Sequence, residues 1–129
     1  MAEAKFYKCS HCGNVLTTLV DAGVTPVCCG DPMTVLQAGV TDAALEKHVP
    51  VVEKEDDGNH ITIKVGAVAH PMTEEHLIQF IAFTYENRLY TQKLTAADAP
   101  EACFSVKDNT KPITAYEYCN LHGLWKAEA

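Results

Sequence analysis

Apolar and polar residues alternate over short stretches of this chain, which predicts β-strands rather than long helices. Ile61, Ile63 and Val65 are separated by polar residues, so a strand here has one apolar face, and His60 falls on the polar one. Further short apolar runs are bounded by polar or turn-forming residues, at 51–54, 77–85, 89–94, 102–106 and 113–118. Several short strands at regular spacing indicate an antiparallel β-sandwich.

Turn-forming residues divide these runs into hairpins. Asp56-Asp57-Gly58-Asn59 precedes the strand that begins near Ile61, and Glu86-Asn87-Arg88 separates the runs 77–85 and 89–94. Upstream, Thr41 is a candidate N-cap for one or two helical turns. Pro50 makes continuation of that helix unfavourable, so the chain is expected to enter the sandwich there.

The first 37 residues form a region of different character. Short strands are predicted at 6–8, 15–20 and 33–36, but their apolar residues are too few to bury a core of their own. Such a segment needs a metal or disulfide staple. We therefore divide the chain into a small module, 1–37, and a larger domain, 38–129, which starts with a linker of small residues.

Charge and composition narrow the classes of partner. The net charge is −7, and Lys and Arg do not cluster, so a nucleic acid or an anionic membrane surface is not expected as a partner. No apolar run approaches the roughly 20 residues of a membrane-spanning helix. The N-terminus lacks the basic and then apolar layout of a secretory signal, so we expect a cytoplasmic protein.

Four of the six cysteines lie in the first module and form a candidate metal site. Cys9 and Cys12 make a C-x-x-C knuckle, and Cys28 and Cys29 follow as an adjacent pair. Four thiolates on two turns can surround zinc or iron, and the spacing alone favours a structural zinc ion over iron or disulfides. The adjacent pair predicts a distorted tetrahedron. His11, between two of these cysteines, is expected to point to solvent.

A second candidate site combines histidines with one cysteine in the larger domain. Cys119 and His122 form a C-x-x-H motif, while His48, His70 and His76 stand at the ends of predicted strands or in turns. Loops at one edge of a sandwich can bring such residues together. Four imidazoles and a thiolate exceed what tetrahedral zinc accepts, and five ligands with one free position suit redox chemistry on a small molecule.

Not every donor residue fits this second site. Cys103 alternates with Ala102 and Phe104 in a predicted strand, so we interpret it as a small core residue rather than a ligand.

The motifs around these residues resemble those of a known family. The first module is similar to desulforedoxin through C-x-x-C-G and C-C-G-x-P-M, at residues 9–13 and 28–33. The remainder resembles the catalytic domain of superoxide reductases through E-K-H-V-P-V, H-P-M and E-Y-C-N-x-H-G-x-W-K, at 46–51, 70–72 and 117–126. In this order they resemble desulfoferrodoxin over nearly the whole chain.

The resemblance implies an all-β fold, with a rubredoxin- or desulforedoxin-like iron module followed by an immunoglobulin-like antiparallel sandwich. It also implies two irons per chain. One iron is held by the four cysteines of the first module. The other has His48, His70, His76 and His122 in a plane and Cys119 as the axial ligand.

The same resemblance implies a function and assigns two further residues. The expected reaction is the one-electron reduction of superoxide to hydrogen peroxide, without oxygen evolution, as detoxification of superoxide. Lys47 is the local positive charge beside the substrate position, and Glu46 occupies that position in the oxidised resting state. A rubredoxin-like protein is the expected electron donor, and the expected assembly is a homodimer. The alternative is an iron protein that only transfers electrons.

Overall fold

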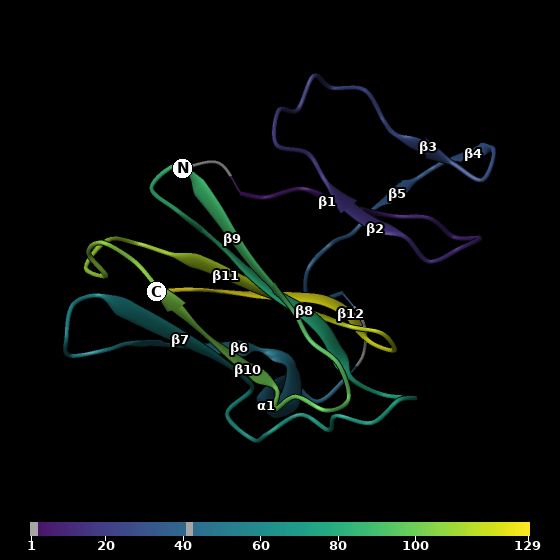
Figure 1. The fold of residues 1–129 in the computed structure, drawn as a ribbon. Coiled ribbons are helices and arrows are strands. Elements are labelled where there is room, and N and C mark those ends of the chain that lie inside the picture. The colour runs from purple at the N-terminus through teal and green to yellow at the C-terminus, as the bar shows by residue number, and fades with distance from the viewer. Residues whose placement is uncertain (1–2, 41–42) are drawn as a thin grey trace. The chain divides into compact units, whose positions relative to one another are not determined.

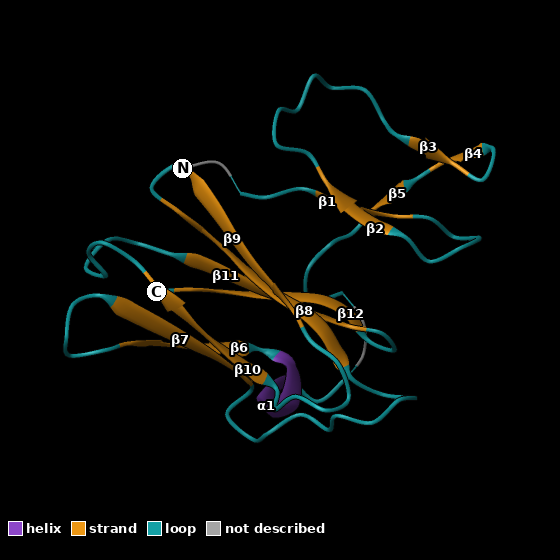
Figure 2. Cartoon of the chain, viewed as in Figure 1, coloured by secondary structure: helices purple, strands orange, loops and turns teal. Residues whose placement is uncertain are grey.

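The structure is a computed structural model that describes residues 3–40 and 43–129 (Figure 1). It divides the chain into two compact units, one ending at Gln37 and the other running from Ala38 to Ala129. The regular secondary structure of both units consists of strands joined by loops, apart from one short helix in the larger unit (Figure 2). The predicted all-β fold, with a small first module and an antiparallel sandwich, is confirmed.

The small unit contains five short strands. They are β1 (Phe6–Lys8), β2 (Val15–Thr17), β3 (Val27–Cys28), β4 (Asp31–Pro32) and β5 (Thr34–Val35). Strands β2, β1 and β5 form one antiparallel sheet, and β3 pairs with β4. Its buried cluster consists of Tyr7, Cys9 and Met33. With so few buried side chains, metal binding is expected to contribute much of the stability.

The large unit is a sandwich of two antiparallel sheets. Its elements are α1 (Leu45–His48), β6 (Pro50–Lys54), β7 (His60–Val65), β8 (Ile78–Tyr85), β9 (Arg88–Lys93), β10 (Glu101–Ser105), β11 (Thr114–Cys119) and β12 (Gly123–Glu128). One sheet has the order β10-β7-β6 and the other β12-β11-β8-β9. Both predicted hairpins are present, as the pairs β6–β7 and β8–β9.

The core between the two sheets follows the predicted alternation. Ile61, Ile63 and Val65 are buried on β7, and they pack in one cluster with residues of β8 such as Ile81 and Phe83. His60 is half-exposed, and its ring contacts Asp57 in the adjoining turn. The apolar face of β7 therefore points to the core, as expected, and His60 stays at the surface.

Two details differ from the sequence predictions. Cys103 is exposed rather than in the core, because Ala102 is the buried residue of that part of β10 and Cys103 pairs with Thr62 on the outer face. Strand β2 ends at Thr17 instead of residue 20. The apolar side chains that follow Thr17, Leu19 and Val20, are exposed.

The predicted helical turn is present but begins later than expected. The proposed N-cap, Thr41, lies outside the described residues. In the described part of the chain the helix begins at Leu45, and Ala44 precedes it without a side-chain cap. Its last residue, His48, is buried.

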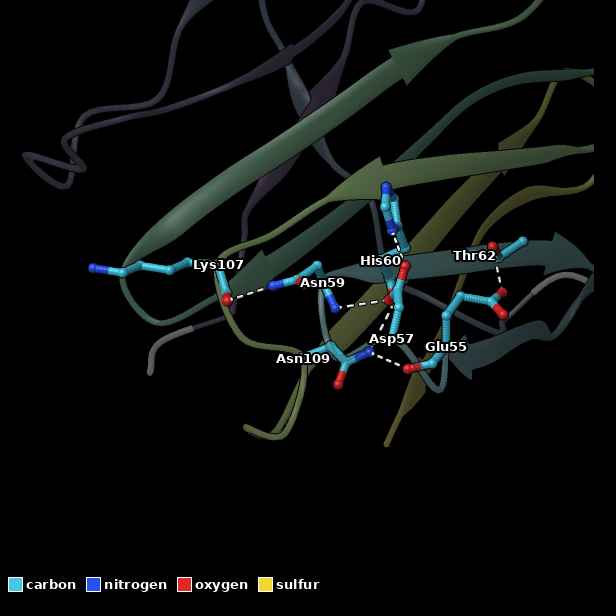
Figure 3. A network of polar contacts seen from close by, with 7 residues as sticks. All are labelled: Glu55, Asp57, Asn59, His60, Thr62, Lys107 and Asn109. Carbon is cyan, nitrogen blue, oxygen red and sulfur yellow. Dashed lines mark hydrogen bonds and ion pairs between the residues drawn. The ribbon is translucent and has the colours of Figure 1, made fainter.

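A polar network ties the β6–β7 turn to the loop after β10 (Figure 3). The Asn109 side chain is buried, and its amide donates hydrogen bonds to the carbonyl oxygens of Glu55 and His60, at 2.7 and 2.9 Å. The backbone N–H of Asn109 donates to Gly58. One buried side chain therefore adds a second donor to two carbonyl groups of the turn, which also accept from the backbone N–H groups of Gly58 and Glu55.

Replacement of Asn109 by alanine should lower the free energy of unfolding by about 2 kcal/mol, because the two hydrogen bonds of this buried side chain are lost. Asn59→Ala is the matched control, since that amide also donates to a carbonyl, of Lys107, but at an exposed position. Asn59→Ala should lower the free energy of unfolding by less than half as much as Asn109→Ala. Thermal unfolding of the iron-loaded variants measures both, and equal losses would show that the burial of Asn109 is not what matters.

Candidate metal centres

The structure brings the predicted ligand residues together in two separate groups. The cysteines of the small unit form one group, and His48, His70, His76, Cys119 and His122 form the other. Within each group the candidate donor atoms all lie within 4.8 Å of one another. That spacing is short enough for one ion to contact every donor in a group.

In the four-cysteine group, Cys9 is prepared to act as a thiolate. The backbone N–H groups of His11 and Cys12 point at Cys9 Sγ, each at 3.4 Å. These hydrogen bonds lower the pKa of Cys9 to about 6, with the Cys12 N–H as the largest cause. Gly13 follows the knuckle with φ of +81°, a conformation that glycine adopts without strain.

The pKa values of the second pair of cysteines are shifted in the opposite direction. The neighbouring thiols of Cys12 and Cys9 raise the pKa of Cys28, and they raise that of Cys29 to about 12. Negative charges this close repel one another unless a cation lies among them. Four sulfur donors in this arrangement fit a tetrahedral iron or zinc ion.

His11 is not part of this group. Its Nε2 atom lies 2.5 Å from a carboxylate oxygen of Asp31, and the ring is exposed. It therefore points outward, as the sequence predicted.

The second group is assembled from the ends of secondary-structure elements and from loops, which meet at one edge of the sandwich. His48 ends α1, and His70 and His76 lie in the loop between β7 and β8. Cys119 is the last residue of β11, and His122 lies in the turn to β12. The prediction that loops at one edge bring these residues together is confirmed.

Hydrogen bonds set which nitrogen of each imidazole is available. Nδ1–H of His48 donates to the Ala44 carbonyl at 2.7 Å, and that of His70 donates to the Pro71 carbonyl at 2.6 Å. This tautomer leaves Nε2 without a proton, as a metal ligand must be, and in His48 that atom lies 3.1 Å from Nδ1 of His122. Among the described residues, the buried Nε2 atoms of His70 and His76 have no hydrogen-bond partner. These unpartnered atoms fit a metal ligand set.

The four rings are arranged as a closed square. Adjacent rings meet nearly edge to face, with centroid distances of 4.8 Å for His48–His70, 4.6 Å for His70–His76, 5.1 Å for His76–His122 and 4.8 Å for His122–His48. Cys119 Sγ lies 3.8 Å from Nδ1 of His122 and is buried. Four nitrogens and a buried sulfur can thus surround an ion and leave one approach open.

Burial favours the neutral form of two of the imidazoles, His70 and His76, and neutral imidazole is the form that binds metal. Burial lowers the pKa of His70 to about 4, and it is also the largest cause of the lowered pKa of His76. A neighbouring positive charge on Lys47 acts on His76 in the same direction.

The Cys119 thiol responds to two opposing influences. Burial raises its pKa, while backbone N–H groups of Leu121 and His122 lower it. The C-x-x-H turn therefore directs two donors at the sulfur. Burial also raises the pKa of Glu117 to about 9, and the charge of this carboxylate, when it forms, raises the pKa of Cys119 further.

Trp125 supports two of these histidines, a role that the sequence did not single out. Its ring lies 5.2 Å from that of His48, and Nε1–H donates to the His122 carbonyl at 3.0 Å. The indole is buried, so it holds both residues from the side of β12.

A hollow of about 340 Å³ opens over this group. The four histidines line it together with Lys47 and the small apolar residues Ala43, Ala44 and Pro71. Lys47 thus lies beside the hollow, and its role there stays a prediction. Glu46 is exposed on α1 and is not among the described residues that line the hollow.

Comparison with known proteins gives matches over both units. The family model described as Desulfoferrodoxin matches residues 40–128, and that described as Desulfoferrodoxin, N-terminal domain, matches residues 2–36. A desulfoferrodoxin of Syntrophotalea carbinolica is 50% identical over 129 residues, 99% of this chain and 99% of its own length. A superoxide reductase of Pyrococcus horikoshii is 34% identical over 98 residues, 64% of this chain and 85% of its own.

Solved structures show the same architecture. The superoxide reductase from Treponema pallidum matches with a TM-score of 0.79 and 33% identity, over 98% of this chain and 99% of that chain. A superoxide reductase with one iron, from Giardia intestinalis, has a TM-score of 0.55 and 36% identity, over 65% of this chain and 97% of its own.

Proposed function

Because the chain belongs to the desulfoferrodoxin family, we propose that it is a superoxide reductase that acts at the centre formed by four histidines and Cys119. The observation that carries this proposal is the square of four imidazoles next to a buried thiol, with a hollow that Lys47 also lines. A donor set of this kind suits iron. The four-cysteine group holds a second iron.

The chemistry that iron supplies when bound is the transfer of one electron, which with two protons converts superoxide to hydrogen peroxide. The chain's own residues solve a problem of charge. The protein carries a net charge of −7, which repels an anionic substrate at long range. Lys47 places a positive charge at the mouth of the hollow, so superoxide is attracted to the one place where it can react.

Cys119 and Glu46 have complementary roles in this proposal. The buried Cys119 sulfur would hold the iron together with the four histidines, and the charge that it donates would favour departure of the product. The N–H groups of Leu121 and His122 tune how much charge the sulfur donates. Glu46, which precedes Lys47 on α1, would supply a carboxylate that could bind the iron in its oxidised form.

Partners and location complete the proposal. A rubredoxin-like protein returns the electron, and removal of superoxide is the cellular purpose. All six cysteines are free, which suits the reducing cytoplasm. Among the described residues no helix is long and apolar enough to cross a membrane.

A homodimer through the small unit is supported by its exposed apolar side chains. Leu19, Val20, Val24 and Val27 are between 67% and 87% exposed. Apolar side chains gathered in so small a unit are typical of a surface that a second copy covers.

The four-cysteine centre is proposed to stabilise the small unit without taking part in the reaction. Cys12→Ser should remove about one iron per chain and lower the melting temperature of the small unit, while superoxide reduction stays near the parent rate. Cys12 is exposed, so the change buries no new group. Iron analysis and the rate of superoxide loss measure this, and loss of both irons from a folded sandwich would contradict it.

The alternative function is an iron protein that only transfers electrons. Stopped-flow mixing of the fully reduced protein with superoxide distinguishes the two. A reductase should be oxidised by superoxide in a fast second-order step and produce peroxide. A pure carrier would react with its protein partners but leave superoxide to decay at its spontaneous rate.

A further inference from the structure

We propose that the backbone of residues 65–70 acts as a brace that holds α1 over the histidine centre, and that Gly66 is a positioning residue for Lys47. The inference rests on the proposed role of Lys47 in attracting superoxide. It concerns a segment that contacts α1 through main-chain atoms.

The brace is visible as a set of backbone hydrogen bonds. Val68 N–H donates to the Glu46 carbonyl at 2.8 Å, which fixes the middle of α1. The same segment is closed on itself, because His70 N–H donates to the Val65 carbonyl at 2.9 Å and Gly66 N–H to that of Val68 at 3.3 Å. Its ends are anchored, since Val65 is the buried end of β7 and His70 belongs to the ligand group.

Gly66 lets the two segments approach this closely. A Cβ atom at this position would lie 2.7 Å from the Glu46 carbonyl oxygen, 3.0 Å from the carbonyl carbon of Lys47 and 3.0 Å from the Val49 carbonyl oxygen. All three are backbone atoms, so no side chain can rotate away to make room. Gly66 does not have the positive φ of the other glycines described, so close contact and not backbone conformation requires glycine here.

The helix itself cannot hold its place without such support. It is four residues long and lacks a side-chain N-cap, and helices this short are not stable in isolation. Lys47 is exposed, so its own side chain is not an anchor. His48 fixes one end of α1 through its bond to the Ala44 carbonyl and its place in the ligand group. The brace fixes the part that carries Glu46 and Lys47.

The test compares three variants of the iron-loaded protein. Gly66→Ala adds one methyl group against the α1 backbone. Val68→Pro removes the N–H that donates to Glu46 and adds nothing at position 66. Val68→Ala is the matched control, because it keeps that N–H and shortens a side chain that is 51% exposed.

Gly66→Ala should lower the second-order rate with superoxide roughly tenfold and flatten its dependence on ionic strength, because Lys47 moves from the hollow. Val68→Pro should do the same, and Val68→Ala should match the parent. Hydrogen exchange of the amides in residues 44–49 is the readout that does not depend on activity. It should be faster in Gly66→Ala and Val68→Pro only.

The outcomes separate this inference from the proposed function. Parent rates and parent exchange in both Gly66→Ala and Val68→Pro would overturn the brace. If Gly66→Ala does not fold, Val68→Pro decides alone. If the parent protein does not react with superoxide, the proposed function fails, while exchange in residues 44–49 still shows whether the brace exists.

Discussion

Replacing Cys119 with serine should abolish turnover and remove the visible absorption of the histidine centre. Serine oxygen donates less charge than thiolate sulfur, and it lacks the low-energy sulfur-to-iron transition that gives a ferric thiolate site its colour. Because Cys119 is a proposed ligand and fully buried, we expect the rate of peroxide formation to fall by more than about a hundredfold. Pulse radiolysis of the reduced variant, with peroxide assayed afterwards, measures the effect.

Cys103→Ser is the matched control for this experiment. Cys103 is the other cysteine of the large unit, but it is exposed on β10 and does not belong to the ligand group. Its replacement should leave the spectrum and the rate unchanged. A Cys119→Ser protein that keeps its visible band and forms peroxide at the parent rate would show that Cys119 is not the axial ligand.

Replacing Lys47 with alanine should slow the reaction with superoxide by about tenfold or more, without loss of iron. The charge of this side chain is the local attraction that overcomes the negative protein, and attraction between exposed charges weakens as salt is added. The parent rate should therefore fall with ionic strength, and the Lys47→Ala rate should depend on it less.

Lys111→Ala removes the same charge from the exposed loop before β11, at the opposite end of that strand from Cys119, and Lys111 is not among the described residues that line the hollow. It should change the rate by less than about twofold, since an exposed charge beyond a screening length acts weakly. Equal effects of the two substitutions would mean that net charge, and not the position of Lys47, governs the encounter.

Alternation along the chain was enough to predict much of the sandwich. Ile61, Ile63 and Val65 alternate with polar residues, and the structure buries all three. The prediction for Cys103 was wrong because its neighbours in the strand are also apolar, so the sequence does not show which residue faces the core. The pairing of β10 with β7 decides which residue faces inward. Strand β12 was not predicted, since its sequence does not alternate and its pairing with β11 forms it.

For the two metal centres, too, features that depend on neighbouring residues could be predicted from the sequence, and features that depend on distant residues could not. Short motifs predicted which residues gather in each group, because C-x-x-C and C-x-x-H turns are local structures. Spacing did not identify the metal of the first group, since four thiolates suit zinc and iron alike. Gly66 gave no signal, because the reason for it lies in the backbone of residues 46–49, which only the fold brings into contact.

The oxygen balance of the reaction tests the central claim most directly. Under anaerobic turnover with a reduced electron donor, a known amount of superoxide is supplied while peroxide and dissolved oxygen are both measured. A reductase should yield one peroxide for each superoxide consumed and release no oxygen. Half that yield of peroxide, with oxygen released in equal amount, would show dismutation and contradict the account.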